Sequence, residues 1–81
     1  MKLITEGDTK NIIGPRLKTA RQKNKLTQQQ LSIKLETMAI YIDRASISKI
    51  ELQKRIVTDY ELFAFSQLLN VSVHWLLGIE N

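Results

Sequence analysis

The sequence predicts a compact, all-α domain built from five helices. Four segments place an apolar residue directly before a capping residue and a second apolar residue four positions after it: Leu26-Thr27 with Leu31, Ile42-Asp43 with Ile47, Val57-Thr58 with Leu62, and Val71-Ser72 with Leu76. This arrangement, the hydrophobic staple, marks the start of a helix. No strand-like alternation competes with it, because the best candidate strand, residues 39–42, is short and has no partner. Four helix starts in 81 residues therefore indicate one helical core.

The first part of the chain divides into an arm and a helix. Residues 1–11 are polar and aperiodic, and we expect them to form a flexible arm, with the folded domain over residues 12–81. Gly14-Pro15 begins the first helix, because proline at the first helical position loses no hydrogen bond. This helix ends near residues 24–25. Its inward stripe follows the spacing i, i+3, i+4 and consists of Leu17, Ala20 and Arg21.

The four staples begin the remaining helices. We expect these over residues 28 to 36 or 38, 44–52, 59–69 and 73–77. Two of them carry a capping box, formed by Thr27 with Gln30 and by Thr58 with Glu61, and each cap contributes about 1 kcal/mol. At the helix ends, Asn70 suits a left-handed position and Gly78 stops the last helix. Apolar helix faces place three aromatic side chains in the core: Phe63, Phe65 and Trp75.

The composition excludes several classes of protein. The chain contains no cysteine, which excludes a disulfide framework and a cysteine-based zinc site. No window approaches the roughly 18 consecutive apolar residues of a membrane span, and the N-terminus lacks the apolar core of a secretory signal. We therefore expect a cytoplasmic protein. His74 is the only histidine, the carboxylates are scattered and no Gly-rich phosphate loop is present, so we expect no metal, no cofactor and no enzymatic activity.

Positive charge is concentrated in the middle of the chain. Residues 16–55 contain ten basic and three acidic residues, a formal charge of +7, whereas residues 56–81 carry −3 and residues 1–15 are neutral. One part of the domain should therefore attract a polyanion. A solvated basic surface without such a partner is the alternative, and charge alone does not separate the two.

The third predicted helix has the chemistry of a DNA reader. Ile47 and Ile50 occupy one face, and the polar residues Arg44, Ser46, Ser48 and Lys49 lie elsewhere. A short helix with a buried back and a basic, hydroxylated front fits the DNA major groove. Arg44 also opposes the positive end of the helix dipole, which favours a role other than helix stability. The alternative is an arginine that merely sits on a solvated helix start.

From Ile13 to Gly78 the chain resembles the lambda-repressor-like, Cro/C1-type (XRE) helix-turn-helix family. Four blocks carry the resemblance in the family's order: Gly14-Pro15-Arg16-Leu17 with Ala20-Arg21, Leu26-Thr27-Gln28-Gln29-Gln30-Leu31, Ile47-Ser48-Lys49-Ile50-Glu51, and Val71-Ser72-Val73-His74-Trp75-Leu76-Leu77-Gly78. The resemblance implies a five-helix fold in which the second and third helices form the helix-turn-helix.

Three positions depart from the family pattern. Ser32 stands where alanine is common, and about five extra residues separate Leu35 from Asp43. We expect these residues to lengthen the second helix and widen the turn. Gln53 replaces the glycine that often follows the third helix, so we expect this helix to run further.

The resemblance, together with the charge and position of individual residues, gives the candidate site residues. The base contacts are Arg44, Ala45 and Lys49. The candidates for contacts with the DNA backbone are Thr27, Gln28, Ser46, Gln53, Lys54 and Arg55, with Arg16 and Lys23 as further candidates. Arg21 and Glu51 would form a structural ion pair between the first and third helices. His74 is expected on the surface.

These observations favour a sequence-specific, double-stranded-DNA-binding transcriptional regulator of prokaryotic or phage type. We expect it to act as a repressor that occupies a promoter, with contact to polymerase as the alternative. We expect a homodimer, joined through residues 73–81, on a near-palindromic operator. No small-molecule ligand is evident. Two alternatives remain open: an antitoxin that represses its own operon, and a helical protein-interaction module that has lost DNA binding.

Overall fold

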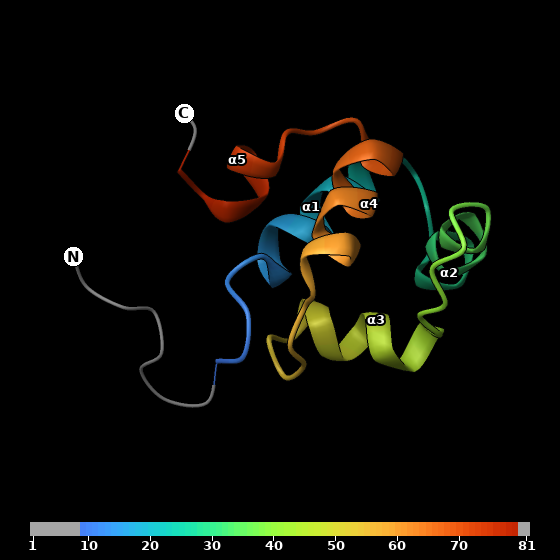
Figure 1. The fold of residues 1–81 in the computed structure, drawn as a ribbon, viewed down its shortest axis with the longest axis horizontal. Helices are drawn as coiled ribbons and strands as arrows, with labels where there is room; N and C mark the ends of the chain where they lie inside the picture. Colours follow the sequence, from blue (N-terminus) through green and yellow to red (C-terminus); the bar gives the residue numbers. More distant parts are fainter. Residues whose placement is uncertain (1–8, 80–81) are drawn as a thin grey trace.

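The computed structural model describes residues 9–79, which form five helices and no strand. The helices are α1 (Gly14–Lys23), α2 (Gln28–Glu36), α3 (Arg44–Glu51), α4 (Asp59–Leu69) and α5 (Val73–Leu77). In Figure 1, α1 and α4 lie at the centre, α2 and α5 lie on opposite sides of them, and α3 runs along one edge. The predicted all-helical, five-helix architecture is confirmed.

The four later helices begin at the expected capping residues. In each, a side-chain oxygen accepts a hydrogen bond from the backbone N–H three residues further on, at 2.7–3.2 Å: Thr27 from Gln30, Asp43 from Ser46, Thr58 from Glu61, and Ser72 from Trp75. Both predicted capping boxes are complete, because the Gln30 and Glu61 side chains accept from the backbone N–H groups of Thr27 and Thr58. These bonds satisfy donors that a helix start otherwise leaves without partners.

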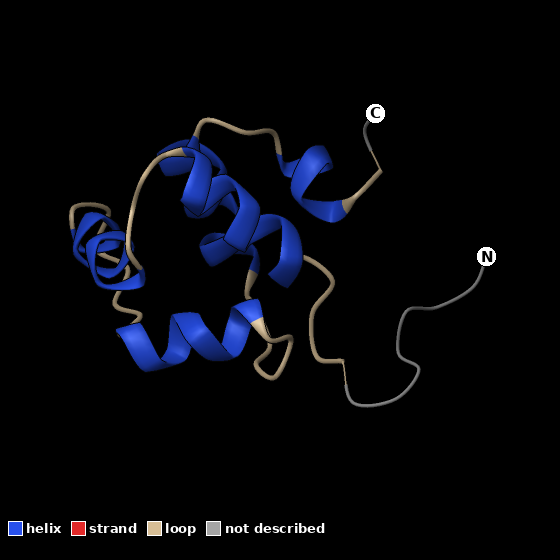
Figure 2. Ribbon diagram, turned by 180° about the vertical axis from the view of Figure 1, so that it is seen from behind, coloured by secondary structure: helices blue, strands red, loops and turns tan. Residues whose placement is uncertain are grey.

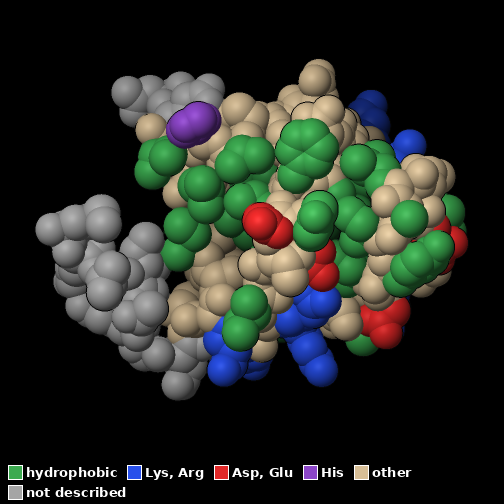
Figure 3. Space-filling view, viewed as in Figure 1, with side chains coloured by type: hydrophobic (Ala, Val, Ile, Leu, Met, Phe, Trp, Pro, Cys, Tyr) green, Lys and Arg blue, Asp and Glu red, His purple; other side chains and the backbone are tan. Residues whose placement is uncertain are grey.

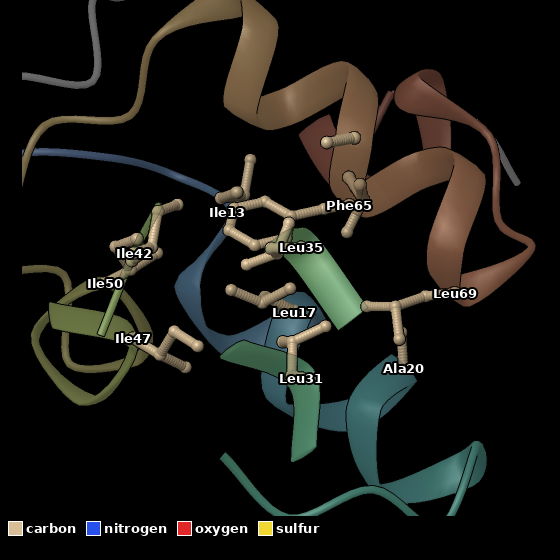
Figure 4. Packing of buried hydrophobic residues seen from close by; sticks show 12 residues of the cluster. Ile13, Leu17, Ala20, Leu31, Leu35, Ile42, Ile47, Ile50, Phe65 and Leu69 are labelled. Atoms are coloured by element: carbon tan, nitrogen blue, oxygen red, sulfur yellow. The ribbon is translucent and has the colours of Figure 1, made fainter. Parts of the chain in front are cut away.

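One apolar core joins all five helices. Twelve residues form it: Ile13, Leu17, Ala20, Leu31, Leu35, Ile42, Ile47, Ile50, Ala64, Phe65, Leu69 and Leu76. Figure 4 shows the Phe65 ring of α4 pointing toward Leu17 and Leu35. Phe63, by contrast, is 55% exposed, so the expectation that both phenylalanines lie in the core is wrong for this residue. Residues two positions apart on a helix point in directions that differ by about 200°. Phe63 therefore points outward when Phe65 points inward.

The long connection between α2 and α3 is a fixed turn and not an extension of α2. Helix α2 ends at Glu36, and Ala39 adopts a left-handed backbone conformation with φ of 59°. The N–H of Ile40 then donates to the Leu35 carbonyl at 3.1 Å. Ile42 is buried, and its carbonyl accepts a 2.7 Å hydrogen bond from the Ser32 hydroxyl. The extra residues therefore widen the turn, as expected, but do not lengthen α2.

Candidate nucleic-acid interface

Helix α3 presents one side to the core and the other to solvent. Ile47 and Ile50 are completely buried, whereas Arg44, Ala45 and Lys49 are exposed. Figures 1 and 2 show the same arrangement from opposite directions, with the outer side of α3 uncovered by any other helix. All three residues predicted to contact bases therefore lie on accessible surface.

Two more residues share the outward side of α3 without having been named as DNA contacts: Ser48, and Leu52 directly after the end of the helix. At about 100° per residue, Ala45, Ser48, Lys49 and Leu52 fall within a sector of about 100°, and Arg44 borders it at the start of the helix. Ser48 is half-buried, and Leu52 is 62% exposed despite its apolar side chain. The spacing i, i+3, i+4, i+7 from Ala45 was the available signal for both residues.

The start of α3 is fixed by its capping carboxylate. Hydrogen bonds from the backbone N–H and the hydroxyl of Ser46, together with the charges of Lys49 and Arg55, hold the pKa of Asp43 below its ordinary value of 3.8. Asp43 is therefore ionised at neutral pH and stabilises the positive end of the helix. Ser46 was predicted to contact the DNA backbone, but the structure engages both of its donor groups in this cap.

A buried cluster of charged and amide groups ties α3 to α1 and α2. The Nε of Arg21 lies 2.7 Å from the Oε2 of Glu51, and its Nη2 donates to Oε1 at 3.1 Å. The Nη1 of the same arginine donates to the Leu26 carbonyl at 2.8 Å. The structure thus contains the ion pair expected between these helices. Gln28 adds a contact that the sequence did not suggest, because its Nε2 donates to Glu51 Oε1 at 3.1 Å.

The loop after α3 carries three further predicted phosphate contacts, which differ in availability. Lys54 is exposed, and its backbone N–H donates to the Lys49 carbonyl at 2.7 Å. Arg55 instead forms a two-pronged ion pair with Glu61 at 3.0 and 3.1 Å. This contact raises the pKa of Arg55 above its ordinary value. We had expected α3 to run further because the usual glycine is missing, and this is wrong: Gln53 itself adopts a φ of 64°, and α3 stops at Glu51.

These features make α2 and α3 a helix-turn-helix pair with an exposed second helix. A model of the helix-turn-helix family of Cro/C1 type matches residues 17–76. The chain belongs to this family. Its members are DNA-binding regulatory domains, so the family implies binding to double-stranded DNA. No curated protein and no solved structure matches the sequence.

Two of the predicted backbone contacts of this helix-turn-helix domain lie away from α3. The guanidinium carbon of Arg16 lies 5.0 Å from the centre of the Trp75 ring, a cation–π contact between α1 and α5. Lys23 borders a surface hollow that is also lined by Trp75 and by the turn between α4 and α5. The contacts of Arg16 and Lys23 are therefore with the side of the molecule that carries α5.

The chain just before α1 belongs to the folded domain. The expected arm extends to residue 11, yet Lys10 and Asn11 are hydrogen-bonded to the loop that follows α3. Residues 1–8 of the expected arm lie outside the described residues. The contacts at Lys10 and Asn11 involve long-range backbone carbonyls, which no local sequence pattern indicates.

Charge and apolar surface separate on the molecule. In Figure 3, several Lys and Arg side chains lie along the edge that carries the end of α3 and the loop after it, and others lie at the opposite edge, whereas hydrophobic side chains spread over α4 and α5. The edge formed by α3 is thus the surface that suits a polyanion.

Among residues 9–79, no three His, Cys, Asp or Glu residues are grouped to hold a metal ion, and no helix is long and apolar enough to cross a membrane.

Proposed function

We propose that the protein is a sequence-specific transcriptional regulator of prokaryotic or phage type that acts as a repressor by occupying a promoter. In this proposal α3 enters the major groove of its operator. One observation carries the proposal: α3 has a fully buried apolar back and an outward side bordered by two exposed cations, Arg44 and Lys49. A major groove about 12 Å wide admits such a helix with its side chains directed at base edges.

Each proposed contact follows from the position of a side chain on α3 or beside it. Arg44 would donate two hydrogen bonds to guanine O6 and N7, and Ala45 would contact a thymine methyl group. Lys49 would donate to a base acceptor or to a phosphate. Thr27 and Gln28 at the start of α2, together with Lys54 after α3, would hold the DNA backbone and set the register without reading sequence.

We further propose that two copies bind a near-palindrome, with their recognition helices about 34 Å apart in successive major grooves. One domain contacts few bases, and a symmetric dimer doubles the number it reads. The proposed contact between copies is the surface of residues 73–81, of which 80 and 81 lie outside the described residues. It includes Ile79, which is 69% exposed, and the exposed His74.

Selection of bound duplexes from a random oligonucleotide pool tests the proposal. The wild type should yield a defined, near-palindromic motif, and Arg44→Ala should lose preference at one base pair per half-site, worth about 1–3 kcal/mol of discrimination. The proposal is wrong if the wild type selects no motif, and Arg44 is not a reader if its variant selects the same motif. A protein that ignores all duplexes at low salt would instead support the interaction module.

A pair of lysine variants separates backbone contacts from general charge effects. Lys54→Ala should weaken binding to all sequences alike and reduce the slope of log affinity against log salt by about 0.9. Lys23→Ala removes the same charge beside the turn between α4 and α5 and is the matched control. Equal effects of the two substitutions would mean that net charge, and not the position of Lys54, governs the binding.

A further inference from the structure

The segment Lys10–Asn11 forms a junction with the loop that follows the recognition helix. The side-chain Nδ2 of Asn11 donates to two carbonyls, that of Ile50 at 3.0 Å and that of Arg55 at 2.9 Å. Its Oδ1 accepts from the N–H of Gly14 at 2.9 Å. One partly buried amide thus bridges the start of α1, the end of α3 and the end of the basic loop.

Gln53 closes the junction from the other side. Its Nε2 donates to the Asn11 carbonyl at 3.0 Å, and its own carbonyl accepts from the N–H of Lys10 at 2.9 Å. Gln53 adopts a left-handed conformation, φ 64°, which is unfavourable for a residue with a Cβ atom. Family members often have glycine here, which adopts this conformation at no steric cost. In this chain, hydrogen bonds to residues 10 and 11 hold the same turn without a glycine.

The junction leaves little room for the two segments to shift. A Cβ atom on Gly14 would lie 2.5 Å from the Ile50 carbonyl oxygen and 2.8 Å from that of Glu51, so the backbones of α1 and α3 are in close contact. Lys10 and Lys54 are both exposed. The backbone N–H of Lys10 donates to the Gln53 carbonyl, and Lys54 is the next residue after Gln53 in the chain. Two cations are therefore held at the end of the recognition helix.

From this geometry we infer that Asn11 is a positioning residue for DNA binding. It holds the loop after α3 so that Lys54, joined there by Lys10, contacts a phosphate beside the major groove. The inference rests on the proposed function and extends it to a segment before α1. Asn11 itself does not touch the DNA, and it acts through the carbonyls of Ile50 and Arg55.

Two asparagine variants test the inference, because the chain offers a close control. Asn24 also donates to two carbonyls through Nδ2, those of Ala20 at 2.8 Å and Leu69 at 3.1 Å, but at the other end of α1. Asn11→Ala and Asn24→Ala both remove an amide and leave the net charge unchanged. Each folded variant is titrated with a duplex selected by the wild type, at several salt concentrations and well below its melting temperature.

Asn11→Ala should weaken binding by up to about eightfold at about 0.1 M salt and lower the salt slope by up to about 0.9, the effect of one lost phosphate contact. Asn24→Ala should leave both quantities unchanged even if it lowers the melting temperature. Combining Asn11→Ala with Lys54→Ala should give less than the sum of the two single losses, because the first variant already displaces the lysine.

The outcomes separate the inference from the function on which it rests. If the wild type binds its selected duplex while Asn11→Ala and Asn24→Ala behave alike, the inference is overturned and the proposed function stands. Full additivity of Asn11→Ala with Lys54→Ala also overturns it. If the wild type binds no duplex at low salt, the proposed function fails first. The inference is supported if Asn11→Ala lowers the salt slope while Asn24→Ala does not, and if Asn11→Ala causes no further decrease in a protein that already carries Lys54→Ala.

Discussion

Removal of the Glu51 carboxylate should cost a large part of the stability of this domain. The Glu51 side chain is 3% exposed and accepts three hydrogen bonds, two from Arg21 and one from Gln28. Glu51→Ala leaves the Arg21 guanidinium, 10% exposed, with only the Leu26 carbonyl as a partner. Breaking a buried pair in this way costs about 3–5 kcal/mol. A chain of this length has a free energy of unfolding of about 4–12 kcal/mol.

Urea unfolding followed by circular dichroism measures this loss directly. The midpoint should fall strongly for Glu51→Ala while the slope m is unchanged, because the surface exposed on unfolding is nearly the same. Glu36→Ala is the matched control, since Glu36 is an exposed glutamate on α2 and its removal should change stability by less than about 0.5 kcal/mol. Equal midpoints for the two variants would refute the reasoning.

A double variant shows whether the loss of stability comes from the missing ion pair or from the buried charge that a single substitution leaves without a partner. Replacing both residues, as in Arg21→Met with Glu51→Leu, removes the buried charge of Arg21 together with its partner. We expect the double variant to be clearly more stable than Glu51→Leu alone. A double variant as unstable as the sum of its singles would mean that the pair contributes through packing alone.

Two further predictions concern the fold. Gly14→Ala should lower stability by about 1–3 kcal/mol although alanine favours helices, because its Cβ would lie 2.5 Å from the Ile50 carbonyl oxygen; a urea midpoint at or above that of Thr19→Ala, an exposed change on α1, would contradict this. Burial raises the pKa of Glu61, but hydrogen bonds from Arg55 and Thr58 outweigh it and hold the pKa below 4.5. The folded state therefore binds fewer protons than the unfolded state below about pH 4.5, and stability falls as the pH drops through the lowered pKa. Glu61→Gln removes this contribution, so urea midpoints should decline less steeply toward about pH 3 than in the wild type, and an unchanged decline would count against the Arg55–Glu61 pair.

Helix boundaries were predictable because their causes are local. Four helices begin with a side chain that accepts from the backbone N–H three residues further along, a pattern that is visible in the sequence. The capping residues are Thr27, Asp43, Thr58 and Ser72. Asn70 likewise takes the expected left-handed conformation, with φ of 55°. The outward side of α3 followed from helical periodicity once Ile47 and Ile50 were assigned to the core.

The errors came from contacts between residues far apart in the chain. Nothing local indicates that Asn11 lies against the carbonyls of residues 50 and 55, or that Gln53 is held in a glycine-like conformation by it. The ion pair of Arg55 with Glu61 at the start of α4 was likewise not foreseen, and the contact of Arg55 with phosphate stays a prediction. A charge count cannot distinguish a free cation from one that is already paired.

Besides its capping residue Asp43, three contacts with the rest of the chain hold the recognition helix, and only that of Glu51 was foreseen. The Ser32–Ile42 hydrogen bond fixes the residue before the cap, Glu51 fixes the last turn, and Asn11 fixes the end of the helix. An α3 of eight residues cannot fix its own orientation, and base readout requires side chains placed to within about 0.5 Å. Substitutions at Ser32 or Asn11 should therefore alter DNA binding although neither residue lies on the outward side of α3.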